Sequence, residues 1–159
     1  MCENPFLYKA RADHLFEKVW LKGNLLRWWS RLLGRKGQLL DLFDQKLDGK
    51  MVSRHYCGIM EIPLNQIKGS ENRAADFDAN FYPLKSEDRD RWVGIAELIL
   101  LHGNLDAVNL IQIEDVFFVR DGHHRVSVAR ALGVEFIDAE VTQWQTDGKL
   151  ENFSSSPGR

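Results

Sequence analysis

The hydrophobic pattern divides the chain into a helical N-terminal part and a longer part that contains strands. Between residues 5 and 48, apolar residues recur at helical spacing, in the sets Leu15, Phe16, Val19, Trp20 and Leu25, Leu26, Trp28, Trp29, Leu32, Leu33. Gly23-Asn24 and the stretch 34–37 interrupt this pattern. The sequence therefore predicts separate helices, with a third short helix over Gln38–Leu47.

From Val52 onward the pattern changes to short apolar runs that alternate with helical segments. A run ending in Ile62-Pro63 predicts a strand, residues 64–70 a turn or short helix, and residues 71–83 a long polar loop with aromatic residues in it. Ser86 and Gly103 are suited to begin and end the next helix. The remaining predicted elements are strands at Val108–Ile113, Val116–Val119 and Phe136–Val141, with a helix at His123–Leu132.

These elements predict an α+β fold, a mixed sheet of four or five short strands with helices packed against it. The turn at Asp48-Gly49-Lys50 separates a helical N-terminal extension, 1–50, from the main domain, 51–144. Residues 145–159 end in a polar Ser, Pro and Gly stretch, which predicts a disordered tail.

Composition removes several classes of protein. The 159 residues are 44% hydrophobic with a net charge of −2, which excludes a disordered chain and gives no overall positive field. Cys2 and Cys57 form no C-x-x-C pair, so neither a zinc site nor a disulfide framework is expected, and no metal-binding residues are assigned. Without a signal segment or an 18-residue apolar run, the chain is expected to be cytoplasmic.

The charge is unevenly placed, because six basic residues are interleaved with the N-terminal tryptophans. They are Lys18, Lys22, Arg27, Arg31, Arg35 and Lys36. Such a segment suits an amphipathic surface-binding element or contact with a DNA backbone. The alternative is a helical cap whose apolar stripe packs on the main domain.

Chemistry concentrates where an apolar strand runs through Arg120-Asp121-Gly122 into a helix beginning at His123. Free N–H groups at a helix start attract anions, and glycine lets a phosphate approach the backbone closely. Arg125 is suited to grip phosphate oxygens, while His123 and His124 add donors or a titratable group. The corner therefore predicts a nucleotide phosphate site; the alternative is that Asp121 caps the helix and the histidines are structural.

The stretch D-G-H-H-R-V-S-V-A-R-A-L-G over residues 121–133, between two short strands, resembles the signature of the ParB/sulfiredoxin superfamily. The resemblance covers about residues 56–144. Sulfiredoxins carry a catalytic cysteine where this chain has His123, so sulfinic-acid reduction is disfavoured. The partition proteins bind CTP and follow this domain with a DNA-reading module, for which too few residues follow Trp144.

The remaining branch resembles the free-serine kinases, and implies a small-molecule phosphotransferase. ATP, ADP or CTP, with Mg²⁺, would be held by Asp121, Gly122, His123, His124 and Arg125, with Ser127 as a further donor. Glu71 would act as the base toward a hydroxyl-bearing acceptor such as serine, and Arg73 would neutralise charge on the transferred group. Asp76 and Asp78 are alternatives for the base. A non-catalytic nucleotide-responsive module that contacts DNA or a protein partner stays open, and a nuclease is disfavoured because no metal-binding histidine spacing is present.

Overall fold

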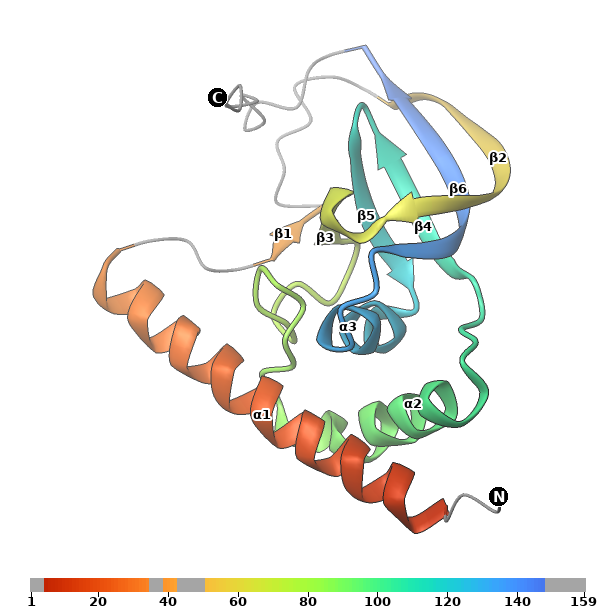
Figure 1. The fold of residues 1–159 in the computed structure, drawn as a ribbon. Helices are drawn as coiled ribbons and strands as arrows, with labels where there is room; N and C mark the ends of the chain where they lie inside the picture. The colour runs from red at the N-terminus through yellow and green to blue at the C-terminus, as the bar shows by residue number, and fades with distance from the viewer. Residues whose placement is uncertain (1–4, 35–38, 43–50, 148–159) are drawn as a thin grey trace, which may run out of the picture.

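The computed structural model describes residues 5–34, 39–42 and 51–147. In these ranges a six-stranded mixed sheet is covered on one face by helices (Figure 1). The strands lie in the order β1-β3-β5-β4-β6-β2. Their bounds are β1 Leu40–Asp41, β2 Met51–Pro63, β3 Ile67–Ser70, β4 Val108–Ile113, β5 Val116–Asp121 and β6 Phe136–Thr146. The helices are α1 Pro5–Leu32, α2 Arg89–His102 and α3 His123–Ala131, with short 3-10 turns η1 Leu64–Gln66 and η2 Ser86–Asp88.

Both parallel and antiparallel pairs occur in the sheet. The pairs β1–β3, β3–β5 and β4–β6 are parallel, whereas β4–β5 and β6–β2 are antiparallel. The β4–β5 pair is a hairpin around Glu114, whose φ of 52° suits the tight turn. The predicted α+β class with a mixed sheet is confirmed.

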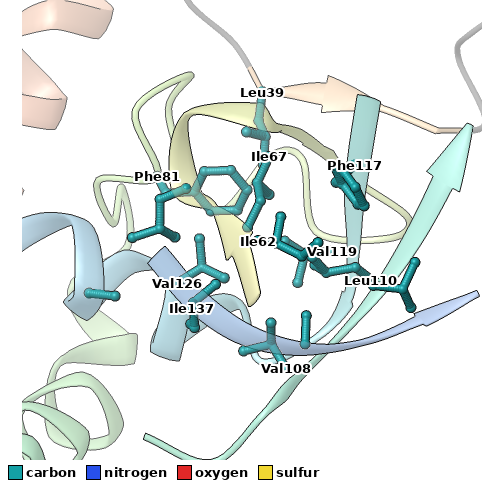
Figure 2. Close-up of a cluster of buried hydrophobic side chains, with 14 of the residues drawn as sticks. Leu39, Ile62, Ile67, Phe81, Val108, Leu110, Phe117, Val119, Val126 and Ile137 are labelled. Atoms are coloured by element: carbon teal, nitrogen blue, oxygen red, sulfur yellow. The ribbon is translucent and has the colours of Figure 1, made fainter. Parts of the chain in front are cut away.

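The main core lies between the sheet and α3 (Figure 2). Side chains from one face of β4, β5 and β6, such as Leu110 and Val119, meet Val126 from α3. The loop between β3 and α2 contributes Phe77 and Phe81, both fully buried. The aromatic residues of this polar loop are therefore core residues, and they hold the loop against the start of α3.

A second apolar cluster joins the three helices. Ala12, Phe16 and Val19 of α1 pack against α2, where Trp92 is fully buried, and Val128 of α3 completes the cluster. The rings of Phe16 and Trp92 meet edge to face at 5.5 Å between centroids. The layers are thus the sheet, then α3, then α2 and α1 (Figure 1).

Two predictions for the N-terminal part were wrong. First, α1 is one helix of 28 residues that continues through Gly23. A Cβ at Gly23 would lie 2.8 Å from the Cβ of Tyr82, so this glycine admits a neighbouring segment and does not break the helix. The side chain of Asn24 donates to the Trp20 carbonyl at 2.9 Å and so stays within helical geometry.

Second, residues Leu40–Asp41 form a strand and not part of a helix. Of the predicted third helix, residues 39–42 are described and the rest lies outside the described residues. Leu39 is buried in the main core, while Leu42 is buried on the opposite face of the sheet with Phe118. Apolar side chains on both faces need an extended backbone, because successive side chains of a strand point to opposite faces. A strand from the predicted extension therefore joins the sheet of the main domain.

Two further differences concern the strands. Residues 67–70 form β3, where a turn or short helix was expected, and β6 runs on through Gln145 to Thr146, into the predicted tail. The tail from 148 to 159 lies outside the described residues. No helix among the described residues is both long and apolar enough to cross a membrane.

Candidate functional site

The predicted corner between strand and helix is present, and Gly122 forms it. β5 ends at Asp121, Gly122 has φ 94° and ψ 22°, and α3 begins at His123. A Cβ at Gly122 would lie 2.6 Å from Cγ1 and 2.9 Å from Cβ of Val108, so a side chain does not fit. Glycine is needed here for its positive φ and for its close contact with β4.

Asp121 does not cap α3. The alternative interpretation of the sequence, in which Asp121 caps this helix, is therefore wrong. Gly122 is the N-cap residue and no side chain bonds to the cap, while the first helical bond runs from the Val126 N–H to the Gly122 carbonyl. The amides of the first turn therefore have no acceptor within the helix. The positive end of the helix dipole is also located here.

A polar pocket of about 190 Å³ opens at this corner. It is lined by Asn72, Arg73, Arg91, Ile95, Arg120, Asp121, Gly122, His123, His124 and Arg125. Four arginines thus face one aspartate around the start of a helix, which suits an anionic ligand with several oxygens. The structure brings together six of the residues assigned from the sequence, namely Arg73 and residues 121–125.

His123 is held by a network that specifies its protonation. Ser70 Oγ accepts hydrogen bonds from the backbone N–H groups of Asn72, at 3.2 Å, and Arg73, at 2.8 Å. Its own hydrogen is then directed to Nε2 of His123, 2.8 Å away. Burial, with the nearby positive charge of Arg73, lowers the pKa of His123 to about 4. His123 is therefore neutral at pH 7 and ties the β3 end to α3.

His124 is also buried and is oriented toward a carboxylate. Its Nε2 lies 3.1 Å from Oδ1 of Asp88, outside good hydrogen-bond alignment, and the two groups would form an ion pair only with the imidazole protonated. Burial lowers the pKa of His124, against the opposing effect of Asp88. Phe77 contacts both imidazoles, with centroid distances of 6.1 Å to His123 and 5.5 Å to His124. The histidine pair thus forms a neutral wall of the pocket at pH 7.

Arg125 is a structural clamp at the pocket edge. Its Nη1 donates to the carbonyls of Ala107, at 2.6 Å, and Asp106, at 3.2 Å, and its Nη2 donates to Asp121 Oδ2 at 2.7 Å. Both terminal nitrogens therefore already have acceptors: Nη1 joins α3 to the segment before β4, and Nη2 joins it to the end of β5. Its predicted role as the phosphate grip stays a prediction, and its removal would disturb the corner as well as the pocket.

The other three arginines differ in how far their charge is neutralised. Arg120 Nε and Nη2 donate to the two carboxylate oxygens of Glu71 at 3.0 and 3.3 Å. Arg73 Nε donates to Asp76 at 2.8 Å, and its Nη2 lies 3.6 Å from Asp88. Arg91, by contrast, has no ion pair among the described residues. Arg91 is therefore the cation of the pocket that is readiest to receive an anion.

Two residues assigned from the sequence lie outside the pocket lining. Glu71 follows β3, and its amide donates to the Val119 carbonyl at 2.9 Å. Its carboxylate accepts a hydrogen bond from Arg120, which lines the pocket. Ser127 is buried, and its Oγ accepts a hydrogen bond from Trp92 Nε1 at 2.8 Å. Ser127 therefore anchors α3 to α2.

The alternative carboxylates for the base are part of the loop scaffold. Asp76 bonds to Arg73 and, at 2.6 Å, to Lys85; these partners lower its pKa although burial acts in the opposite direction. Asp78 Oδ1 accepts from the amides of Asn80 and Tyr82, and burial raises the pKa of Asp78 despite those bonds. Both carboxylates are engaged in shaping the loop that contains Phe77 and Phe81.

A larger, more apolar hollow adjoins the polar pocket. It has a volume of about 460 Å³ and shares Arg91, Ile95 and Arg125 with that pocket. Its other lining residues are Leu98, Ile99, His102, Asn104, Leu105 and Asp106. The shared residues make one continuous surface that is cationic at the corner and apolar along α2, and pockets of such size and character hold small organic ligands.

Sequence reasoning missed Arg91, Asn72 and Arg120 as pocket residues. Arg91 carried a weak signal, since it is an arginine in the first turn of a helix, a position that helix electrostatics disfavours. No group of three or more His, Cys, Asp or Glu side chains suited to a metal ion occurs in the described ranges. A Mg²⁺ ion brought by a nucleotide would therefore find one carboxylate in the pocket lining, that of Asp121.

No family model and no curated protein sequence matches the chain. Among solved structures, a sulfiredoxin from Arabidopsis thaliana is similar over 52% of this chain and 82% of its own, with 19% sequence identity and a TM-score of 0.41. That degree of similarity assigns no activity, and the site itself carries the functional argument.

Proposed function

We propose that this protein binds a nucleoside di- or triphosphate, with the phosphates in the polar pocket at the start of α3. The observation that carries the proposal is the pocket lining: four arginines surround a helix N-terminus, and Arg91 among them has no ion pair within the described part of the chain. Phosphate oxygens satisfy both the first-turn amides and the guanidinium donors. The same corner contains the D-G-H-H-R stretch that resembles the ParB/sulfiredoxin signature.

The size of the two hollows favours a nucleotide over inorganic phosphate. The polar pocket, at about 190 Å³, suits phosphate groups but is small for a whole nucleotide. The adjoining hollow offers about 460 Å³ and apolar side chains such as Leu98 and Leu105, against which a base and sugar would pack. His102 and Asn104 at its rim supply polar groups for the base.

Loss of the Arg91 guanidinium should weaken nucleotide binding roughly 10- to 100-fold, the effect of one charge-assisted hydrogen bond. Arg91→Ala is compared with wild type by calorimetry and by thermal shift, using ATP, ADP, CTP and GTP with Mg²⁺. A nucleotide at 100 times its dissociation constant should stabilise the wild type by about 2.7 kcal/mol.

The matched control is Arg89→Ala, two residues away on the same helix. Arg89 pairs with Asp13 at 3.0 Å and Glu17 at 3.4 Å on α1, and it does not line the polar pocket. Its removal should leave nucleotide affinity unchanged. Absence of any shift with all four nucleotides, or equal loss in both variants, would contradict the proposal.

For catalysis, we propose a phosphotransferase of the kind that the resemblance implies. The bond between the γ-phosphorus of a nucleoside triphosphate and its bridging oxygen would break, with the nucleoside diphosphate as the leaving group. A new P–O bond would form to the acceptor hydroxyl oxygen, and Glu71 would take the hydroxyl proton. Positioning and electrostatic stabilisation supply most of the catalysis in such a transfer. The Glu71 carboxylate is hydrogen-bonded to Arg120, and both Arg120 and Arg73 line the pocket.

Glu71→Gln should lower serine phosphorylation with ATP by at least 100-fold, as expected when a general base is lost, while nucleotide affinity stays within threefold. The measurement is phosphoserine formation, with Glu87→Gln, an exposed carboxylate of η2, as the control. Full turnover in Glu71→Gln would exclude Glu71 as the base.

The second candidate is a nucleotide-responsive module without catalysis. It is favoured by the pairing of both Glu71 oxygens with Arg120, because a carboxylate so engaged is a weak base until that pair opens. Nucleotide binding without turnover of serine or other small hydroxyl compounds would support this candidate.

A further inference from the structure

We propose that the C-terminal half of α1 docks on an anionic lipid surface. The inference rests on the outer side of this helix and does not depend on nucleotide binding. Residues 21–33 contain exposed apolar side chains, in the set Leu21, Leu25, Trp28, Trp29, Leu32 and Leu33. All of them are between 47% and 65% exposed, a larger patch of apolar side chains than the isolated ones common on protein surfaces.

The apolar residues of α1 form two stripes on opposite sides of the helix. The buried stripe is Ala12, Phe16, Val19 and Gly23, and the exposed stripe is Leu21, Leu25, Trp28 and Leu32. Both follow the spacing i, i+4, i+7, i+11, and the second is displaced from the first by nine residues. Nine residues are two and a half helical turns, so the exposed stripe points directly away from the body. The second stripe therefore has no role in the packing of α1 on α2.

The buried stripe holds the helix in place while its far end projects. The packing of Phe16 on Trp92 and the close approach of Tyr82 at Gly23 fasten the helix as far as residue 23. No residue of α1 after Gly23 is buried in the described part of the chain. Figure 1 shows these last turns running outward past the loop between β3 and α2. The tryptophans are thus presented on a rigid arm and not on a frayed end.

The positive charge of this segment favours an anionic partner. Residues 18–34 contain Lys18, Lys22, Arg27 and Arg31 and no Asp or Glu, a charge of +4 in a chain whose net charge is −2. On the helix, Lys18 flanks one side of the exposed stripe and Arg31 the other, while the Lys22 ammonium lies over the Tyr82 ring. Leu and Trp on one face with Lys and Arg beside it is the pattern of helices that lie in the headgroup region of anionic membranes.

Other occupants fit less well. A second copy would bring four positive charges against four, which opposes self-association along this stripe. A nucleic-acid backbone would be served by the basic residues but would leave the leucines in water. A receptor groove that surrounds a helix would meet the body at the start of this segment, where Tyr82 lies against Gly23. A flat anionic lipid surface needs to contact only the exposed stripe of α1.

The test is flotation of the full chain with vesicles of phosphatidylcholine alone or with 25% phosphatidylglycerol. We expect at least tenfold stronger binding to the anionic vesicles, weakened in 0.5 M NaCl, with a blue shift of tryptophan fluorescence. The double variant Leu25→Gln/Trp28→Gln should lose binding at least tenfold, and so should Lys18→Glu/Arg31→Glu. All four side chains are at the surface, so the melting temperature should stay near that of the wild type, which shows that folding is retained.

The matched control is Val52→Gln/Ile59→Gln, two side chains of β2 that are each 65% exposed. It removes comparable apolar surface from another part of the molecule and should leave vesicle binding unchanged. Absence of binding to anionic vesicles would overturn the proposal, as would equal loss in the control. A stripe-dependent dimer by light scattering, or stripe-dependent DNA binding, without vesicle binding would overturn it in favour of that partner.

Discussion

Between pH 7 and pH 4.5, the free energy of unfolding should fall by about 2–3 kcal/mol because of His123. The pKa of this buried imidazole is about 4 in the folded protein, against an ordinary value of 6.5 when the chain unfolds. The unfolded state therefore binds more protons in this range, and stability is lost as the pH falls below 6.5 toward 4. His124 acts in the same direction, because burial lowers its pKa too.

The structural reason is that protonated His123 cannot keep its partner. Nε2 of the neutral ring accepts the hydrogen of Ser70, whose oxygen already accepts two backbone N–H groups. A proton on Nε2 would place two donors against each other in a buried site. Acid should therefore loosen the junction between β3 and α3, where His123 lines the candidate site.

Urea unfolding of wild type and His123→Gln across this pH range provides the measurement. The variant is expected to be less stable at pH 7, but its pH dependence should be shallower by about 2 kcal/mol. The control is His102→Gln, the same substitution at an exposed position at the end of α2. An unchanged slope in His123→Gln would show that this imidazole is not the titrating group.

Gly122→Ala should destabilise the protein by about 3 kcal/mol or more and abolish binding at the proposed nucleotide site. Part of the loss is the positive φ of 94°, which costs a residue with a Cβ about 1–3 kcal/mol. The rest is overpacking, because the new Cβ would lie 2.6 Å from Val108 Cγ1, and such overpacking costs about 1–3 kcal/mol. Relief of the clash would shift Gly122 or β4, and with them the first-turn amides of α3.

Gly94→Ala is the matched control, because it is the same substitution with the opposite expected sign. Gly94 lies inside α2, where a Cβ would meet no neighbouring atom within 4 Å, and alanine should stabilise that helix by about 0.5–1 kcal/mol. Chemical unfolding of both variants gives the comparison. If Gly122→Ala loses less than 1 kcal/mol, the corner is not constrained as described.

The candidate corner was predictable because its signals are local. An apolar run followed by Asp121-Gly122 and then by a periodic segment ending at Gly133 predicts strand, turn and helix from neighbours alone. β5 and α3 begin within a residue of where this pattern places them. The end of α2 at Gly103, with φ 68°, followed from the same kind of local signal.

The roles of the side chains around that corner were less accessible. Arg125 binds backbone carbonyls of Asp106 and Ala107. Arg91, assigned no role from the sequence, is the arginine of the pocket lining that has no ion pair with a described residue. Which guanidinium is neutralised depends on what the fold places beside it. Arg120 meets Glu71 from 49 residues earlier in the chain, a contact that no local pattern indicates.

The sequence by itself determined the α+β class, most of the strands, and the glycine turn between β5 and α3, because these depend on backbone preferences within a few residues. The tertiary structure decided that Leu40–Asp41 is a strand, that α1 runs unbroken through Gly23, and that His123 is neutral beneath Ser70. Each of these depends on contacts between segments far apart in the chain, whose energy outweighs local propensity and sets the charge of buried groups.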